Sequence, residues 1–173
     1  MPLNEPIIRH ADIQDRIDSL IPFFDDRTVL MPVMVGALPF VADIIRHHPV
    51  PMNIAHVIPV YASSYHGTEQ ADHVTVAFPS NVDKIAGEDV VIVEDIIDTG
   101  RTVGQILDSL VNYQPKSIQV VTLLDKPSRR VIDVEIDWSG FDVPDTFVVG
   151  YGMDHDGDYR ALPDVWTLTD ETT

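Results

Sequence analysis

Acidic, hydroxyl and glycine residues follow one apolar stretch in a pattern that could bind a sugar phosphate. The stretch is VVIVEDIIDTGRT (residues 90–102), in which Glu94, Asp95 and Asp98 lead into Thr99-Gly100-Arg101-Thr102. A glycine lets the backbone approach a ligand closely, and threonine hydroxyls can donate hydrogen bonds to it. The N–H groups at the start of a following helix would add the positive end of a dipole. A phosphomonoester is the ligand that this turn fits best.

The adjacent carboxylates Glu94 and Asp95 lie just before that turn, where the hydroxyls of a sugar would be placed. Carboxylates accept hydrogen bonds from ribose hydroxyls, either directly or through a hard cation such as Mg²⁺. Asp98 lies nearest to the turn and could accept or relay a proton from a ligand group. A helix cap alone would explain Asp98 or Thr99, but not the pattern as a whole. The stretch therefore predicts a ribose-5-phosphate site.

The strand before this site belongs to a pattern in which strands alternate with helices. Residues 89–93 and 117–124 are apolar runs of strand length, and residues 102–112 between them carry apolar side chains at helical spacing. Runs that are apolar on both faces are typical of parallel strands covered by helices. Ligands bind beyond the carboxyl ends of such strands, so we expect residues 94–102 to form a loop there. The fold class predicted is α/β, with a parallel core sheet flanked by helices.

The segments before this unit fit the same architecture. Pro32 either argues against a strand over 28–35 or places that strand near an edge, since proline cannot donate a hydrogen bond to a sheet. Pro39 suits the first turn of a helix. The expected elements are a helix over 11–24, a strand over 28–35, a turn over 36–39, a helix over 40–48, a strand over 53–61, a polar loop over 63–71, a strand over 74–78 and a connection with a turn at Gly87.

The tail from residue 131 differs from the preceding part and reads as short strands and loops. Short strands are expected around VEIDW (134–138) and TFVVGY (146–151), followed by the acidic loop MDHDGDYR (153–160) and VWTL (165–168). A tail of this length is too short to fold alone. We expect a single domain over residues 1–173, with a core at about 25–125 and a small hood at about 126–173 that the N-terminal segment helps to form.

The composition limits the partners of the protein. Its 28 acidic and 11 basic residues give a net charge of −17, which would repel a nucleic-acid backbone, so we expect no nucleic-acid partner. The same charge would repel an anionic substrate, so a phosphate site must be built from local dipoles, N–H groups and a metal ion. Cysteine is absent, which excludes disulfides and thiolate metal sites. Seven histidines are scattered, and His47-His48 at a helix end suit its dipole better than a metal.

No part of the sequence is typical of a membrane or secreted protein. The longest apolar run, residues 28–45, is interrupted by prolines, a glycine and an aspartate. A membrane-spanning helix needs about 18–20 uninterrupted apolar residues. The N-terminus carries charges early and has no apolar signal-peptide region. We therefore expect a cytoplasmic protein with no membrane partner.

The stretch at residues 90–102 resembles the phosphoribosyl-pyrophosphate (PRPP) motif of type I phosphoribosyltransferases, in the form found in hypoxanthine-guanine phosphoribosyltransferases. Leu123-Leu124-Asp125-Lys126 resembles the family's base-recognition segment, and residues 141–166 are similar to its hood segment. The resemblance covers roughly residues 28–168 and weakens towards the N-terminus. It implies transfer of a 5-phosphoribosyl group from PRPP to hypoxanthine and also guanine, which yields a nucleoside monophosphate and pyrophosphate. It further implies Mg²⁺ as cofactor and a homodimer or homotetramer.

The resemblance assigns the PRPP end of the site to the opening stretch. Glu94 and Asp95 would hold the ribose hydroxyls and Mg²⁺. Asp98 would lie near purine N7 and assist proton transfer as the base attacks or leaves. Asp98 to Thr102, and thus Thr99, Gly100 and Arg101, would cradle the 5′-phosphate, although the Arg101 side chain could equally point to solvent.

The resemblance assigns the purine end to later segments. Lys126 would donate to O6 of a 6-oxopurine, Phe147 would stack on the ring, and the Val148 backbone would contact the edge of the base. Asp154 would help to hold a second Mg²⁺, and Arg160 would bind pyrophosphate. Without the resemblance, Phe147 fits a strand core equally well, Lys126 a solvated loop, and Arg160 an ordinary ion pair.

Two further segments complete the implied site. Ser64 and Tyr65 would belong to a lid that closes over the reacting centre and excludes water. Val35 and Gly36 would form the first pyrophosphate loop, where the family usually has lysine and glycine. In the family, the peptide bond at this loop can be cis, which turns a backbone N–H to pyrophosphate. Valine could keep that backbone role, but it removes any side-chain contact to pyrophosphate or to a neighbouring subunit.

Three alternatives remain open at this point. A xanthine- or guanine-preferring relative differs only in contacts at the purine 2-position, which the sequence does not resolve. A PRPP-sensing regulator of the same fold that binds RNA or DNA is opposed by the net charge of −17 and by the presence of Asp98, Lys126 and Phe147. A receiver-like signalling domain would explain VVIVEDIID, but neither residues 99–102 nor the hood.

Overall fold

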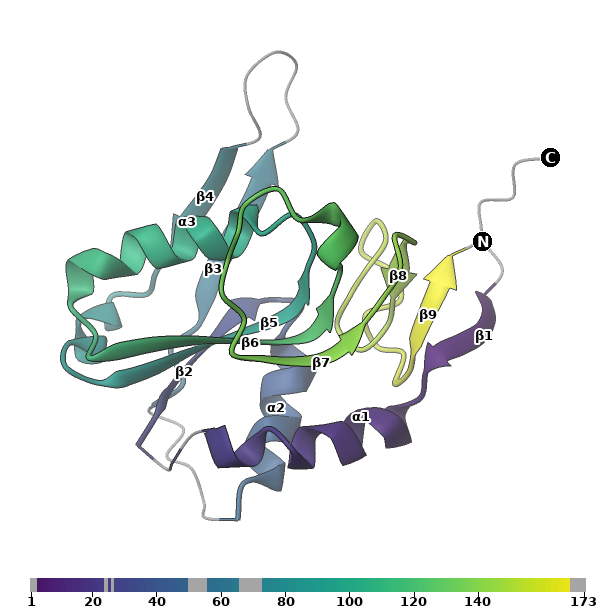
Figure 1. The fold of residues 1–173 in the computed structure, drawn as a ribbon, viewed down its shortest axis with the longest axis horizontal. Helices are drawn as coiled ribbons and strands as arrows, with labels where there is room; N and C mark the ends of the chain where they lie inside the picture. The colour runs from purple at the N-terminus through teal and green to yellow at the C-terminus, as the bar shows by residue number, and fades with distance from the viewer. Residues whose placement is uncertain (1–2, 24, 26, 50–55, 66–72, 169–173) are drawn as a thin grey trace.

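A six-stranded sheet forms the centre of the structure, a computed structural model that describes residues 3–23, 25, 27–49, 56–65 and 73–168. The strand order is β4-β3-β2-β5-β6-β7, and all neighbours are parallel except β3 and β4. The parallel α/β core predicted from the sequence is confirmed (Figure 1). The strands are β2 (Val29–Met34), β3 (Val60–Tyr65), β4 (His73–Ala77), β5 (Asp89–Ile97), β6 (Ser117–Asp125) and β7 (Trp138–Asp142).

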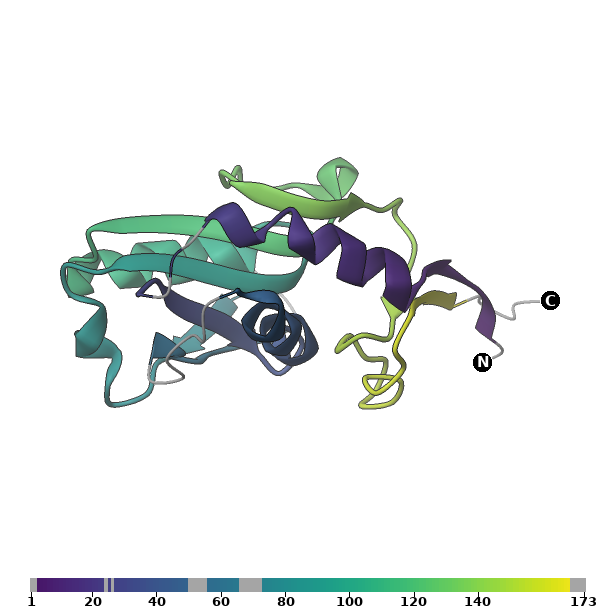
Figure 2. The same cartoon turned by 90° about the horizontal axis from the view of Figure 1, so that it is seen from below.

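Helices cover both faces of this sheet. Helices α1 (His10–Asp18) and α2 (Leu38–His47) lie on one face, and α3 (Arg101–Leu110) lies on the other (Figures 1 and 2). Because side chains alternate along a strand, β5 sends Val91 and Val93 into the core under α1 and α2, while Val90, Ile92 and Ile97 pack under α3. Short 3-10 helices span Ile21–Phe23, Val82–Ile85, Val111–Tyr113 and Pro127–Arg129.

A second, three-stranded sheet lies beside the carboxyl-terminal side of the core (Figure 1). It consists of β1 (Leu3–Ile8), β9 (Val165–Leu168) and β8 (Val148–Val149), in the order β1-β9-β8, and both pairings are antiparallel. The N-terminal strand thus pairs with the last strand of the chain, in line with an N-terminal contribution to the hood. The division into a core at 25–125 and a hood at 126–173 stays a prediction.

The strand before the candidate site is longer than predicted. β5 continues to Ile97, because β6 also continues to Asp125 and pairs with it to the end. Glu94 and Asp95 therefore lie on the strand, and the expectation of a loop over 94–102 was wrong for them. The turn is confined to residues 98–100, and α3 begins at Arg101.

The first half of the chain departs from expectation at two prolines. β2 lies in the interior of the sheet, so the edge position inferred from Pro32 was wrong. On the β3 side of β2, an isolated bridge joins Leu30 to Val57 and the pairing with β3 itself starts at Val33, so Pro32 falls in the gap between them. The helix expected over 11–24 ends at Asp18, because Pro22 lacks the N–H that a helix interior requires.

Two strand boundaries also differ from the predicted ones. β3 extends through Tyr65 into the expected polar loop, while residues 53–55 of the predicted strand lie outside the described residues. No strand forms over 134–137. Val134 and Ile136 pack on the α3 side of the core, and the strand begins at Trp138. That strand, β7, pairs with β6, so part of the tail extends the central sheet.

A buried hydrogen bond ties the segment after β8 to the core. The Tyr151 hydroxyl donates to Asp43 Oδ2 on α2 at 2.7 Å, and both side chains are buried. Gln14 and Arg46 also donate to Asp43, at 2.8 and 2.9 Å. Burial alone would raise the pKa of Asp43, but these three donors outweigh it and hold the pKa below its ordinary value.

We expect Tyr151→Phe to lower the free energy of unfolding by about 1–2 kcal/mol at neutral pH, measured by urea denaturation. Because the folded-state pKa of Asp43 is depressed, this contribution is full above the unfolded-state pKa of about 3.9 and is lost as pH falls below it. The difference between variant and wild type should therefore shrink in acid. Tyr61→Phe, at an exposed tyrosine, is the matched control and should change stability by less than about 0.5 kcal/mol. A difference that is independent of pH would contradict the assigned role of the Asp43 charge.

Candidate active site

The carboxyl end of β5 carries a buried carboxylate pair. Glu94 is only 7% exposed, and its Oε2 atom is buried without a hydrogen-bond partner in the described part of the chain. Burial, reinforced by the neighbouring Asp95 carboxylate, raises the pKa of Glu94 well above its ordinary value. Burial also raises the pKa of Asp95, against the opposing charge of Arg160. Because burial disfavours the charged form of both carboxylates, a cation or the hydroxyl donors of a ligand would stabilise the pair.

The turn between β2 and α2 lies directly against Asp95. The Met34–Val35 peptide bond is cis, as the resemblance implied for this loop. A Cβ atom on Gly36 would lie 1.9 Å from Asp95 Oδ2, so only glycine leaves room for the carboxylate. On its other side, Gly36 O would lie 2.0 Å from a Cβ on Gly152 of the hood. Three segments that are distant in sequence therefore meet at Gly36, while the Val35 side chain is half exposed.

The phosphate turn is braced by the segment that follows the 3-10 helix at 127–129. Gly100 has φ +81°, and a Cβ there would lie 2.3 Å from Ile132 O. Thr99 O accepts hydrogen bonds from Val131 N at 3.0 Å and Ile132 N at 2.9 Å. Since α3 starts at Arg101, the turn lies at the N-terminus of a helix, where an anion is stabilised.

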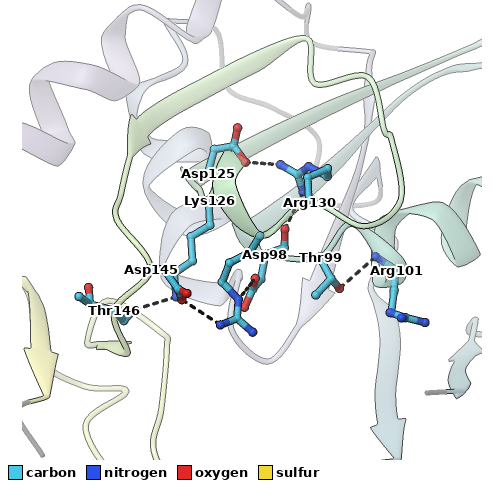
Figure 3. A network of polar contacts seen from close by, with 9 residues as sticks. Asp98, Thr99, Arg101, Asp125, Lys126, Arg130, Asp145 and Thr146 are labelled. Atoms are coloured by element: carbon cyan, nitrogen blue, oxygen red, sulfur yellow. Dashed lines mark hydrogen bonds and ion pairs between the residues drawn. The ribbon is translucent and has the colours of Figure 1, made fainter. Parts of the chain in front are cut away.

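The Arg101 side chain does not join the other predicted residues. It points away from Asp98 and Lys126 in Figure 3 and lines a separate cavity of about 360 Å³ with Asp108 and Ile132. Its predicted contribution to the phosphate cradle therefore rests on its backbone N–H, which lies 3.4 Å from Thr99 Oγ1.

A cavity of about 210 Å³ joins the end of β5 to the hood. Lys126 is only 6% exposed, and its Nζ donates to Thr146 O at 2.7 Å. The Phe147 ring is half exposed and contacts His155 edge-on at 5.1 Å between ring centroids. An aromatic wall, a buried ammonium and carboxylates suit a flat heterocycle that carries a carbonyl group. The lining residues are Asp95, Ile96, Asp98, Lys126, Phe147, Val148, Met153 and Asp154.

The hood loop places Asp154 and Arg160 together. Asp154 Oδ1 pairs with Arg160 Nη2 at 2.6 Å, and its Oδ2 accepts a hydrogen bond from Gly157 N at 2.9 Å. Arg160 also donates to Gly152 O at 2.6 Å, which fixes its guanidinium beside the loop that packs on Gly36.

The carboxylates of the site fit Mg²⁺ only in part. Among the described residues, no group of three or more histidine or carboxylate side chains is arranged to hold a metal ion. Mg²⁺ keeps several waters and is usually bound by one or two carboxylates together with substrate oxygens, which Glu94 and Asp95 could provide. Both oxygens of Asp154 are already engaged, so it fits a metal less well than the pair on β5.

The phosphoribosyl transferase domain family matches residues 7–156 of this chain. The chain belongs to that family. Hypoxanthine phosphoribosyltransferase of Salmonella typhimurium is 39% identical over 92% of this chain and 92% of its own length. A hypoxanthine-guanine phosphoribosyltransferase structure from Bacillus anthracis superposes with a TM-score of 0.84 at 32% identity, over 97% of this chain and all of that one.

Further similarity places the chain in the hypoxanthine(-guanine) branch of the phosphoribosyltransferases. Hypoxanthine phosphoribosyltransferase of Trypanosoma cruzi, solved in complex with the product IMP, has a TM-score of 0.85 at 28% identity, over 99% of this chain and 97% of that one. The family membership predicted from the PRPP motif, the lysine segment and the hood is thereby confirmed.

Two arginines of this phosphoribosyltransferase were missed by sequence reasoning. Arg129 donates from Nε to Asp98 Oδ1 at 2.7 Å and from Nη1 to Asp145 Oδ1 at 2.8 Å. Arg130 donates to the backbone oxygen of Asp98 at 3.1 Å and pairs with Asp125. Three cations within five positions of a chain with net charge −17 were the signal that could have found them.

The predicted lid is described only at its base. Ser64 and Tyr65 end β3, where their backbones pair with Val74 and His73 of β4. The side chains of Ser64 and Tyr65, and residues 66–72, lie outside what the structure describes. Helices long and apolar enough to cross a membrane are absent from the described residues.

Proposed function

We propose that this phosphoribosyltransferase transfers the 5-phosphoribosyl group of PRPP to hypoxanthine and guanine, as a step of purine salvage. The products are a nucleoside monophosphate and pyrophosphate. The observation that carries this proposal is the single cavity in which Lys126 and Phe147 face Asp95 and Asp98 at the end of the PRPP strand. The names of the similar enzymes, and the IMP complex of one of them, support the same reaction.

Base selection rests on the buried ammonium of Lys126. One of its three N–H donors is used by Thr146 O, which leaves donors for O6 of a 6-oxopurine. The 6-amino group of adenine cannot accept such a bond and would leave the ammonium unpaired in a buried site. Phe147 stacks on the ring, and the Val148 backbone reads the edge of the base.

The PRPP end of the site holds the sugar, the 5′-phosphate and the pyrophosphate group. Glu94 and Asp95 bind the ribose hydroxyls, and the turn from Asp98 to Thr102 binds the 5′-phosphate. The backbone of Val35-Gly36 and the Arg160 guanidinium bind pyrophosphate, and Ser64-Tyr65 belong to the lid that excludes water. Glu94 and Asp95 would hold one Mg²⁺ and Asp154 would help to hold a second, and the bound ions would supply positive charge to the leaving pyrophosphate.

Asp98 accepts the proton of purine N7 in the forward reaction and returns it in the reverse reaction. As purine N9 forms its bond to the anomeric carbon of PRPP, the bond from that carbon to the pyrophosphate oxygen breaks. The proton on N7 then passes to the Asp98 carboxylate, which lines the cavity. In the reverse direction, Asp98 returns the proton as the base leaves.

Turnover should depend strictly on Mg²⁺. The chain has a net charge of −17, and the site adds a carboxylate pair, so an anionic substrate cannot be held without added positive charge. We expect excess EDTA to reduce turnover by at least about a hundredfold, and excess Mg²⁺ to restore it. Initial rates of IMP formation from PRPP and hypoxanthine measure this. Appreciable turnover in EDTA would contradict it.

The proposed reaction is tested with purified protein, PRPP, Mg²⁺ and one base at a time. We expect nucleotide from hypoxanthine and guanine, and none from adenine, uracil or cytosine. Xanthine is included because a xanthine- or guanine-preferring enzyme would differ only in the ranking of these bases. The absence of turnover with every 6-oxopurine would refute the assignment.

The assembly is proposed to be a homodimer or homotetramer. Val35 and Leu38 lie next to each other at the pyrophosphate loop, where Leu38 N donates to Val35 O at 3.1 Å, and each apolar side chain is about half exposed. Exposed apolar groups that cluster in this way favour a contact with another chain. Because PRPP and nucleotides carry charges that oppose passage through a bilayer, we place the reaction in the cytoplasm.

A further inference from the structure

Arg129 bridges the turn after β5 and the loop that precedes β8. Its Nε atom bonds to the carboxylate of Asp98, in the turn after β5, at 2.7 Å. Its Nη1 atom bonds to the carboxylate of Asp145, two residues before Phe147, at 2.8 Å. One guanidinium therefore links the residue assigned to proton transfer with the loop that carries the stacking ring.

The backbone beneath Arg129 is fixed by the base-recognition segment. Pro127–Arg129 form a 3-10 helix directly after Lys126, and Arg129 N donates to Lys126 O at 3.1 Å. Lys126 Nζ is itself bonded to Thr146 O, the neighbour of Asp145. Lys126 and Arg129 lie at the two ends of this short helical segment. They bind adjacent residues of the same hood loop, Thr146 and Asp145.

The neighbouring Arg130 contacts the main chain of the turn and not the Asp98 carboxylate. It bonds to the backbone oxygen of Asp98 and to Asp125 at the end of β6, so it holds the main chain of the turn. Arg129 holds the carboxylate itself. A carboxylate has two oxygens, and because Arg129 engages Oδ1, the group is oriented with Oδ2 available to a second partner in the cavity that Asp98 lines.

We propose that Arg129 is a positioning residue of the transfer reaction, which fixes the Asp98 carboxylate against the purine-stacking wall and so aims it at the bound base. This inference rests on the proposed function, because it gives the assigned proton acceptor its orientation. Arg129 acts through Asp98 and touches neither substrate. A guanidinium suits this role because its planar fork can bind two carboxylates at once, whereas an ammonium cannot hold the same geometry.

The test replaces Arg129 by glutamine in the wild-type and Asp98→Asn backgrounds. At saturating PRPP and Mg²⁺, we expect Arg129→Gln to lower kcat/KM for hypoxanthine about 10- to 30-fold, since small misplacements of a reacting group have costs of this order. The KM for PRPP should change by less than about twofold. In the Asp98→Asn background, adding Arg129→Gln should have less than about a twofold further effect, because the group that Arg129 positions is already lost.

A matched control removes another exposed ion pair. Lys116 pairs with Asp89 at 2.6 Å at the opposite end of β5, and Lys116→Gln should leave all kinetic constants unchanged. Circular dichroism and thermal unfolding of each variant establish that the fold is kept.

Two outcomes overturn the inference while the wild type remains active. One is an Arg129→Gln enzyme with kinetics within about twofold of wild type, and the other is a loss that multiplies fully with that of Asp98→Asn, as independent structural damage would. A wild-type protein that turns over no 6-oxopurine refutes the proposed function instead, so the two failures are distinguishable.

Discussion

Asp98→Asn is expected to lower kcat for nucleotide formation by roughly 10²–10⁴-fold, which is the range that general acid–base catalysis supplies. Asparagine has nearly the same shape and can still accept the bond from Arg129 through its amide oxygen, but it cannot take up a proton. Binding of PRPP should be almost unchanged, because the 5′-phosphate is held by the backbone of the turn at 98–102 and by the start of α3.

Steady-state kinetics with each substrate varied in turn separates these two effects. The matched control is Asp89→Asn, which removes an ion-paired aspartate from the other end of β5, far from the cavity. It should leave kcat and both KM values unchanged. A loss in Asp98→Asn that resides in the KM for PRPP, with kcat preserved, would assign Asp98 to phosphate binding and remove it from proton transfer.

The ribose and phosphate end of the site could be predicted because its residues are consecutive in the sequence. An apolar strand, an acid pair and a glycine turn before a helix occupy one stretch, so periodicity and turn chemistry place the ribose and phosphate end. The strand boundary was wrong because backbone pairing decides where β5 ends. β6 supplies partners as far as Asp125, and these hold Glu94 and Asp95 on the strand despite their charge.

The remaining contacts depend on the packing of segments that are distant in sequence. Arg129 reaches Asp98 across 31 positions and Tyr151 reaches Asp43 across 108, and no local pattern encodes either contact. The base residues Lys126 and Phe147 could be assigned in advance only through the family resemblance. They share a cavity because the end of β6 packs beside the hood.

Gly36→Ala is expected to lower kcat/KM for PRPP by at least about a hundredfold, close to 2.7 kcal/mol of transition-state stabilisation. The added methyl group would lie 1.9 Å from Asp95 Oδ2, so the carboxylate must leave its place beside Glu94 or the turn must retreat. Either movement displaces a group assigned to the ribose hydroxyls or to pyrophosphate. The fold should survive, because the clash is with the end of one side chain and the free energy of unfolding should fall by less than about 1 kcal/mol.

Gly87→Ala is the matched control, since its effects should be the reverse. Gly87 has φ +75°, a conformation that costs alanine roughly 1 kcal/mol, but no atom lies within 4 Å of the added Cβ. It should therefore lose stability and keep full activity, whereas Gly36→Ala keeps stability and loses activity. Urea denaturation and PRPP kinetics on both variants give the comparison. If Gly36→Ala retained the wild-type KM for PRPP, the contact between the pyrophosphate loop and Asp95 would have no part in substrate binding, and the loop would serve only to connect β2 to α2.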